Sequence, residues 1–144
     1  MLNIKSIQEN RIDEKLNRSG RTKKQQVIYR TLYMLATDYI RSDENAKYRD
    51  ANPYTKIELA DKLLELANEF DWKCTYTGCA LNLETKDIWK ISFDRIDNSK
   101  PHTPDNMVTT AKWLNCVRGN MPYDQWMQER PWDAVYEAMK AAKQ

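Results

Sequence analysis

Between residues 92 and 120 the chain gathers side chains that could act on a phosphate ester. Asp94 and Asn115 offer a carboxylate and an amide oxygen, and both are hard oxygen ligands of the kind that Mg²⁺ prefers. Two such ligands would bind the ion incompletely and leave positions for water and a phosphate oxygen. From spacing alone the two residues also fit a surface aspartate and a helix-capping asparagine, so both interpretations stand.

Arg95, His102 and Asn106 add three further chemical properties to this stretch. The guanidinium of Arg95 cannot accept a proton, but it can bind a phosphate and stabilise charge that develops in a transition state. His102 is the only histidine of the chain, so it is the one group expected to titrate near neutral pH and a candidate general base. A loop histidine is also commonly structural or solvated. Asn106 is expected to hydrogen-bond to backbone groups of its loop.

Helical patterns precede this stretch. Apolar residues recur every three or four positions between Lys24 and Arg41, which predicts an amphipathic helix. Thr55 followed by Glu58 is typical of a capping box and predicts the start of a second helix. A short helix is also expected at residues 9–16 and a polar loop at residues 42–53. The buried stripe of the second helix is predicted at Leu59, Leu63, Leu66 and Phe70.

The second half of the chain has a different pattern of apolar and polar residues. Residues 89–93 alternate apolar and polar side chains, which predicts a half-buried strand that ends just before Asp94. A loop is expected at residues 98–105, and then a helix from Thr109 to Arg118 that Gly119 ends. Two more helices are predicted at residues 122–128 and 131–142. This order of helices, a small extended unit and further helices indicates an α+β fold.

The ordered set of residues resembles the HNH, or ββα-metal, motif of the His-Me finger nuclease superfamily. In that motif a strand ends in Asp-His, a loop carries a structural asparagine, and the following helix supplies the last metal ligand. Here Asp94-Arg95 takes the Asp-His place, Asn106 the place of the structural asparagine and Asn115 that of the last ligand. The segment NCVRG also resembles a common N-x-x-[KR]-G ending. The likeness covers about residues 74–126 and is greatest to variants reading S-x-D-R-x-D…G-Y-T-x-x-N, which are frequent in phage-type proteins.

The resemblance implies a DNA endonuclease that depends on Mg²⁺ or Mn²⁺. Asp94 and Asn115 would bind the metal, and Arg95 would hold the scissile phosphate. The implied architecture is α+β, with N-terminal helices, a ββα-metal (HNH-like) core and C-terminal helices in one compact domain. Residues 1–71 would form the helical N-terminal part with a basic arm, residues 72–128 the core and residues 129–144 a C-terminal helix.

Arg95 stands where the family usually has the histidine that activates water, so another residue would have to supply or activate the nucleophile. Some HNH-type restriction enzymes with an Asp-Arg pair carry a tyrosine in the preceding cysteine turn, and Tyr76 lies in the corresponding turn here, CTYTG. Its phenolate could attack phosphorus if its pKa fell from about 10. The alternatives are His102 as the base, which stands where the variants have the tyrosine of G-Y-T, and Tyr76 as a packed core residue.

A structural zinc site is not expected. Many relatives carry two C-x-x-C pairs, but Cys74, Cys79 and Cys116 do not form them, and Thr77 falls where a second cysteine would come. A structural Zn²⁺ needs four ligands, and His102 would have to join all three cysteines at irregular spacing.

The charge distribution points to a polyanionic partner. Residues 1–30 hold eight Lys/Arg against three Asp/Glu, a net +5, and residues 31–72 hold five against nine, a net −4. A basic arm suits nucleic acid, although a solvated start of a helix is the other interpretation. Surface charges near the motif could also touch phosphates. The candidate DNA-binding residues are Arg21, Lys23, Lys24, Lys100, Lys112 and Arg118.

Other features concern the setting of the protein. The three cysteines and the polar N-terminal residues favour a protein of the reducing cytoplasm. One form of this expectation is a phage-encoded protein that acts in the host cell. No apolar run is long enough for a membrane span. One motif makes one cut, so double-strand cleavage would need a homodimer or two encounters. Two rival interpretations are a catalytically inactive HNH-like DNA-binding protein and a helical interaction domain that uses the acidic residues 31–72.

Overall fold

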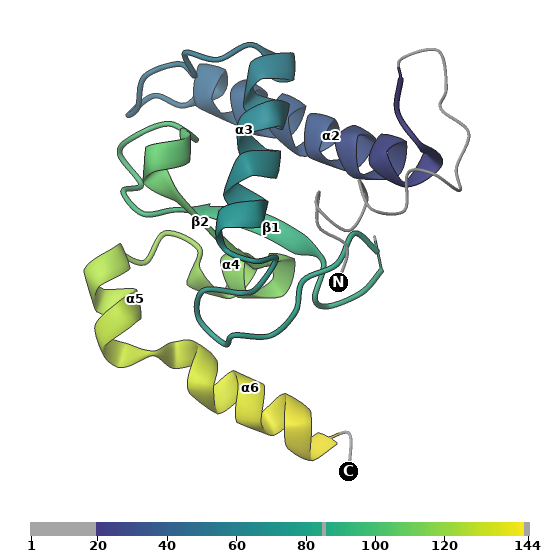
Figure 1. Ribbon diagram of the computed structural model, residues 1–144. Coiled ribbons are helices and arrows are strands. Elements are labelled where there is room, and N and C mark those ends of the chain that lie inside the picture. Colours follow the sequence, from purple (N-terminus) through teal and green to yellow (C-terminus); the bar gives the residue numbers. More distant parts are fainter. Residues whose placement is uncertain (1–19, 85, 143–144) are drawn as a thin grey trace.

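The computed structural model describes residues 20–84 and 86–142. Within these residues the chain forms five α-helices and one two-stranded antiparallel sheet, a mixture consistent with the predicted α+β class (Figure 1). The helix expected at residues 9–16 lies outside the described part. None of the described helices combines the length and the apolar character needed to cross a bilayer.

Helices α2 (Lys23–Asn45) and α3 (Lys56–Glu69) pack against each other above the sheet (Figure 1). The capping box predicted at Thr55 is confirmed, because the Thr55 side chain accepts from the Glu58 amide and Glu58 accepts from the Thr55 amide. Helix α2 runs to Asn45, so the loop expected from residue 42 begins later than predicted. The extension ends near Asp43, a buried polar residue that apolar periodicity does not reveal.

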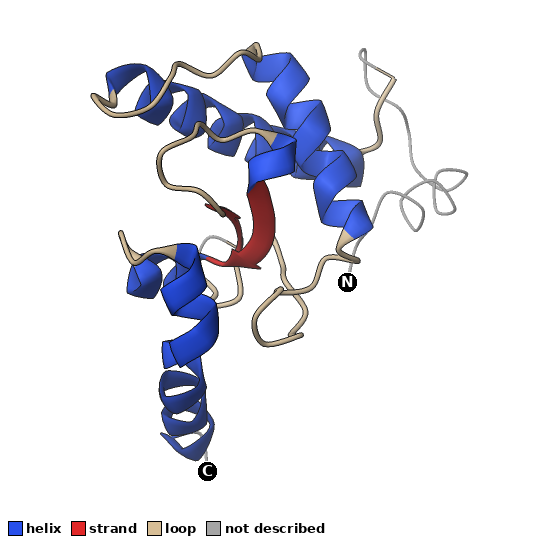
Figure 2. Ribbon diagram, turned by 90° about the vertical axis from the view of Figure 1, so that its left-hand side faces the viewer, coloured by secondary structure: helices blue, strands red, loops and turns tan. Residues whose placement is uncertain are grey.

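Strands β1 (Ile91–Arg95) and β2 (Met107–Ala111) form the sheet, which lies between the upper helices and the C-terminal helices (Figure 2). The predicted strand was placed two residues too early, and Asp94-Arg95 belongs to the strand itself. Strand β2 was missed, because a helix was expected from Thr109. Thr109 is fully buried, and its hydroxyl donates to the Lys73 carbonyl at 2.7 Å, which stabilises extended backbone.

The loop between the strands ends in a short 3₁₀ turn, η2 (Pro104–Asn106), and β2 passes directly into α4 (Lys112–Arg118). Helix α4 packs on both strands. Gly119 ends it with φ 53°, and its amide donates to the carbonyl of Asn115. The resulting order is strand, loop, strand, helix.

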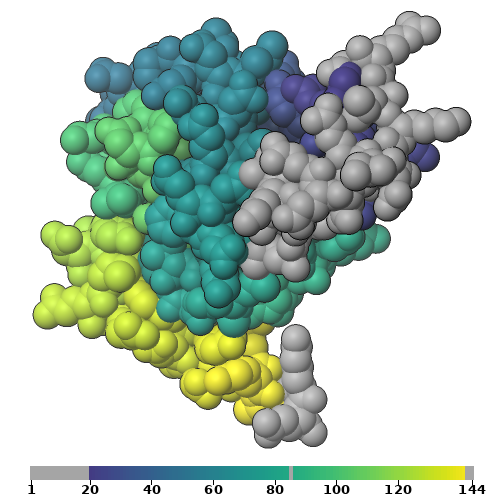
Figure 3. All heavy atoms as spheres, in the orientation of Figure 1, coloured from purple at the N-terminus to yellow at the C-terminus, as the bar shows by residue number. Residues whose placement is uncertain are grey.

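Helices α5 (Tyr123–Glu129) and α6 (Pro131–Ala142) form the lower edge of the molecule in Figure 3. Trp126 and Trp132 are fully buried and lie with their ring centroids 4.8 Å apart. Tyr76 packs against both indoles. The CTYTG segment that carries Tyr76 is a turn, closed by the Gly78 amide on the Cys74 carbonyl. The C-terminal helices therefore hold this turn through aromatic contacts.

We expect the buried stripe of α3 to carry much of the stability of the upper layer. Leu63 is fully buried, so Leu63→Ala should lower the free energy of unfolding by about 2–5 kcal/mol, since it removes apolar contacts and leaves a cavity. Ile57 on the same helix is 59% exposed, and Ile57→Ala should cost no more than about 0.5 kcal/mol. Urea denaturation compares the two, and equal losses would contradict this packing.

Candidate functional site

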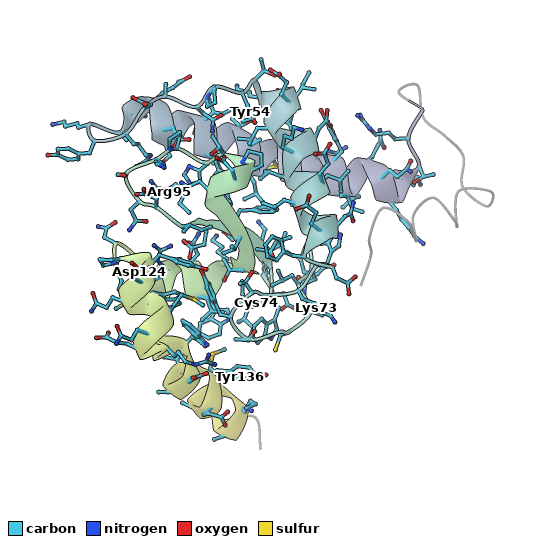
Figure 4. The ribbon with its side chains drawn as sticks, turned by 60° about the vertical axis from the view of Figure 1, so that its left-hand side comes forward. Tyr54, Lys73, Cys74, Arg95, Asp124 and Tyr136 are labelled. Atoms are coloured by element: carbon cyan, nitrogen blue, oxygen red, sulfur yellow. The ribbon has the colours of Figure 1, made fainter. Side chains whose placement is uncertain are left out.

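The end of β1 sends its two charged residues in different directions. Successive side chains of a strand point to opposite faces, and Asp94 contacts α4 whereas Arg95 contacts the loop after the strand. Figure 4 shows Arg95 between the end of α2 and helix α5, which carries Asp124. The candidate residues accordingly form two groups, one around Asp94 and one around Arg95 and His102.

Asp94 is the centre of the first group and is only 5% exposed. Its Oδ1 accepts a hydrogen bond from Arg118 Nη1 at 2.8 Å, and its Oδ2 accepts one from Tyr76 Oη at 2.6 Å. A carboxylate oxygen has two lone pairs, so each oxygen retains one further acceptor position. The carboxylate thus links the strand, the CTYTG turn and helix α4.

Arg118 is buried, whereas it was expected on the surface. It was predicted as a surface charge that could contact phosphates, but it is 2% exposed, because its guanidinium is committed to protein acceptors. No local pattern predicted this burial, since an arginine in the last turn of a helix is commonly solvated. The five acceptors are the Asp94 carboxylate, the carbonyls of Arg95, Ile96 and Met121, and Asn98 Oδ1.

Tyr76 lies in surroundings that oppose a phenolate. Burial raises the pKa of its hydroxyl far above the usual value of 10, and the Asp94 carboxylate raises it further. A nucleophilic tyrosine needs the opposite shift. A cation on Asp94 would offset the effect of the carboxylate, but burial is the larger cause and would remain. The contacts of Tyr76 are those of a packed core tyrosine.

Asn115 lies on α4 and is partly buried. Its Nδ2 donates to Ser92 Oγ at 3.1 Å, which fixes the amide against β1 two residues before Asp94. Its Oδ1 makes no hydrogen bond with any residue the structure describes. Asn115 and Asp94 therefore face the same side of β1 from neighbouring elements, but no hydrogen bond joins them within residues 20–84 and 86–142.

The donor types of Asp94 and Asn115 fit Mg²⁺, which keeps several waters and often takes only one or two protein oxygens. In the described part of the chain, no three His, Cys, Asp or Glu residues gather around a shared point. The Arg118 cation beside Asp94 lowers the affinity of that carboxylate for a second cation. A divalent ion here would need waters and a substrate phosphate to complete its coordination.

The cysteines lie in separate environments. Cys74 Sγ is 3.8 Å from Thr110 Oγ1, whereas Cys79 Sγ is 3.1 Å from Tyr136 Oη on α6. Cys116 is exposed on α4. The described contacts thus give each cysteine a different neighbour.

Arg95 and Asn106 shape the loop between the strands. Arg95 Nη1 donates to the carbonyls of Asn98 and Lys100 at 2.7 and 3.1 Å. Asn106 accepts from the Asp97 amide at 2.9 Å and donates to the carbonyls of Asp97 and Pro101. These bonds close the loop on itself and fix the position of the segment that carries His102.

His102 is buried against the upper helical layer. Its Nδ1 lies 2.9 Å from Asp43 Oδ1, its backbone amide donates to Asp43 Oδ2, and its ring stacks on Tyr39 with centroids 4.3 Å apart. Sequence reasoning missed Asp43. A signal was present, because Asp43 continues the buried stripe of α2 one turn after Tyr39, where an apolar residue would be expected.

The pKa values of Asp43 and His102 are both lowered in the folded protein. Burial raises the pKa of the Asp43 carboxyl, but hydrogen bonds from His102, Arg49 and Asn52 outweigh it and hold that pKa well below its usual range. Burial lowers the pKa of His102 below 6.5, although Asp43 partly opposes the shift. Near neutral pH the pair is therefore a carboxylate and a neutral imidazole.

The predicted DNA-binding residues lie at several places on the surface. Lys23 and Lys24 are exposed in the first turn of α2, and the Arg21 guanidinium lies 3.8 Å from the Tyr29 ring centroid. Lys100 and Lys112 are exposed on the loop and at the start of α4. Apart from the buried Arg118, these side chains are placed where a polyanion could reach them.

A cavity of about 540 Å³ opens between the loop after β1 and the start of α5. Asn98, Ser99, Asn120 and Tyr123 contribute to its wall, and so do the carboxylates of Asp97 and Asp124. The carboxylates make this cavity unsuited to a phosphate.

The Asp94–Arg118 ion pair can be tested by a double-mutant cycle. Arg118→Gln should lower the free energy of unfolding by about 3–5 kcal/mol, because it leaves a buried carboxylate without its cation. The double variant Asp94→Asn/Arg118→Gln should lose less than the sum of the two single losses. Strict additivity in urea denaturation would contradict a direct pair.

Comparison with known proteins identified no relative of this chain. No protein-family model matches the chain, and neither the curated proteins nor the solved structures contain a match.

Proposed function

We propose that this protein is a DNA endonuclease of HNH type that hydrolyses phosphodiester bonds with the help of a divalent metal ion. The observation that carries the proposal is the strand–loop–strand–helix unit of β1, β2 and α4. Asp94 and Arg95 end its first strand, Asn106 ties its loop and Asn115 lies on its helix, in the order in which the HNH motif uses these positions.

Arg95 is the residue proposed to hold the scissile phosphate. Its Nη1 is bound to loop carbonyls, whereas Nε and Nη2 donate to no residue that the structure describes. Burial, and then the nearby Arg49, lower the pKa of Arg95, but a guanidinium remains protonated at neutral pH. A pre-positioned cation with two unused donor nitrogens suits a phosphate oxygen.

Asp94 and Asn115 would hold Mg²⁺ or Mn²⁺. Such an ion polarises a phosphoryl oxygen and stabilises the leaving oxygen. Arg118 and Tyr76 position the Asp94 carboxylate, and Ser92 positions the Asn115 amide. Of the two candidates for proton transfer, His102 is favoured over Tyr76, since it is neutral near pH 7 whereas the tyrosine hydroxyl is held protonated.

One observation favours a second candidate, a catalytically inactive DNA-binding protein on the same scaffold. The Asp94 carboxylate already has a cationic partner in Arg118 at 2.8 Å, and an ion pair of this kind can serve structure alone. The basic residues around α2 and α4 would then bind DNA without cleaving it. Activity measurements separate the two functions.

Plasmid nicking tests the proposed activity. With Mg²⁺ or Mn²⁺, the wild type should relax supercoiled DNA, and Asn115→Ala should lower the rate about 100-fold or more, because it removes a proposed metal ligand at little cost to the core. Asp94→Asn should do the same if it folds. The matched control is Asp61→Asn on the exposed face of α3, which should leave the rate unchanged.

Two results would decide against the enzyme. Binding of DNA without nicking by the wild type, with either metal, would support the inactive DNA-binding protein. Nicking that survives unchanged in Asn115→Ala and Asp94→Asn would show that the activity does not use these ligands.

The salt dependence of DNA affinity tests the proposed partner. If Lys100 and Lys112 each contact a phosphate, changing each to glutamine should reduce the slope of log K against log salt by about 0.9 per residue. Fluorescence anisotropy with a labelled duplex measures the slope. An affinity that does not respond to salt would contradict DNA as the partner and favour a protein-interaction domain.

A further inference from the structure

Asp43, on helix α2 of the upper helical layer, contacts His102 of the proposed site. The carboxylate is 1% exposed and accepts four hydrogen bonds at 2.7–3.0 Å. Two of them come from His102, one from its backbone amide and one from its ring. Arg49 and Asn52 supply the others, and Asn52 also donates to the His102 carbonyl. Asp43 therefore fixes both the backbone and the ring of the site histidine.

The charge of Asp43 determines which ring nitrogen of His102 carries the proton. An ionised carboxylate only accepts hydrogen bonds, so the bond of 2.9 Å between Nδ1 and Oδ1 requires a proton on Nδ1. In a neutral imidazole Nε2 then holds the lone pair. Nε2 makes no hydrogen bond with any residue from 20 to 84 or from 86 to 142.

The ring is held rigidly but not sealed. It is parallel to Tyr39 within 3°, and the His102 side chain is 11% exposed. The described charged and titratable groups that face it are Asp43 and Tyr39 on α2, Arg49 on the following loop, and Arg95 on β1. Burial raises the pKa of Tyr39 to about 12, so this neighbour stays neutral.

We propose that Asp43 and His102 form the proton-accepting pair of the hydrolytic site, with His102 as general base and Asp43 as a positioning residue from outside the strand–loop–strand–helix unit. The catalytic part of this inference rests on the proposed endonuclease function. Helix α2 thereby contributes a residue, Asp43, that lies outside the HNH-like segment.

His102 Nε2 takes a proton from a water molecule while the water oxygen forms a bond to phosphorus. The bond from phosphorus to the leaving oxygen breaks, and solvent protonates that oxygen. The Nδ1 proton stays on the imidazolium, where the Asp43 carboxylate stabilises the positive charge. Arg95 lowers the pKa of His102 electrostatically, which also favours the neutral imidazole that a general base requires.

Nuclear magnetic resonance tests the pair without any substrate. Because His102 is the only histidine, its two ring nitrogens give the only imidazole signals of the chain. At pH 7 we expect a protonated Nδ1 and an unprotonated Nε2, with a titration midpoint below 6.5. Protonation of Nε2 instead of Nδ1 would overturn the proposal.

Two variants of the network should move the titration in opposite directions. Asp43 raises the pKa of His102, so Asp43→Asn should shift the midpoint to lower pH. Arg49 lowers it, so Arg49→Gln should shift the midpoint to higher pH. If His102 is the base, the pH at which the nicking rate falls on the acid side should shift in the same two directions. If Asp43 has only a structural role, the two variants should not shift the pH profile of nicking in opposite directions.

Single-turnover nicking completes the test. His102→Gln should lower the rate about 10²–10⁴-fold, and Asp43→Asn should lower it about tenfold or more at pH 7.5. Circular dichroism checks folding, and His102→Gln carries the test should Asp43→Asn not fold. If the wild type nicks DNA and both variants nick as fast as the wild type, the roles proposed for Asp43 and His102 are wrong, whereas the proposed endonuclease function remains. If the wild type does not nick, the endonuclease and the catalytic role fail together, and the resonance data still decide the tautomer.

Discussion

The buried ion pair between Asp94 and Arg118 is the constraint around which the small unit is organised. Both side chains are almost fully removed from solvent, so neither charge is tolerable without the other. The remaining guanidinium donors bind the carbonyls of Arg95, Ile96 and Met121, so one side chain fixes the end of β1, the start of the loop and the turn after α4. The contact with Asp94 positions the proposed metal ligand, and the bond to the Arg95 carbonyl positions the backbone of the arginine proposed to hold phosphate.

A second buried carboxylate secures the opposite side of the loop. Asp43 binds the backbone and the ring of His102, whereas Asn106 closes the loop from within. The two carboxylates have different partners and therefore different chemical consequences. Asp94 is paired with the Arg118 cation, which limits its attraction for metal, whereas Asp43 is shared between the Arg49 cation and the imidazole of His102, which it orients. The division explains how a site without the usual strand histidine could still contain a base.

Sequence patterns predicted the elements whose signals are local. The capping box at Thr55 marked the start of α3, and Pro131 marked the start of α6. Strand β2 was missed because Thr109 is held by a hydrogen bond to the Lys73 carbonyl, a partner that no local pattern contains. The candidate site was visible as residue types, but the burial of Arg118 and the role of Asp43 depend on partners distant in sequence. A polar residue in a buried stripe, such as Asp43 after Tyr39, indicates a buried hydrogen-bond partner elsewhere in the chain.

Asp94 and Asn115 are proposed to bind one divalent ion in the presence of DNA. Paramagnetic broadening of the backbone amide signals by Mn²⁺, recorded with a short duplex bound, locates that ion. Selective broadening is expected at residues 92–95 of β1 and 112–118 of α4, and it should be lost in Asn115→Ala. Broadening centred elsewhere, or none at Mn²⁺ concentrations that support nicking, would rule out this metal site.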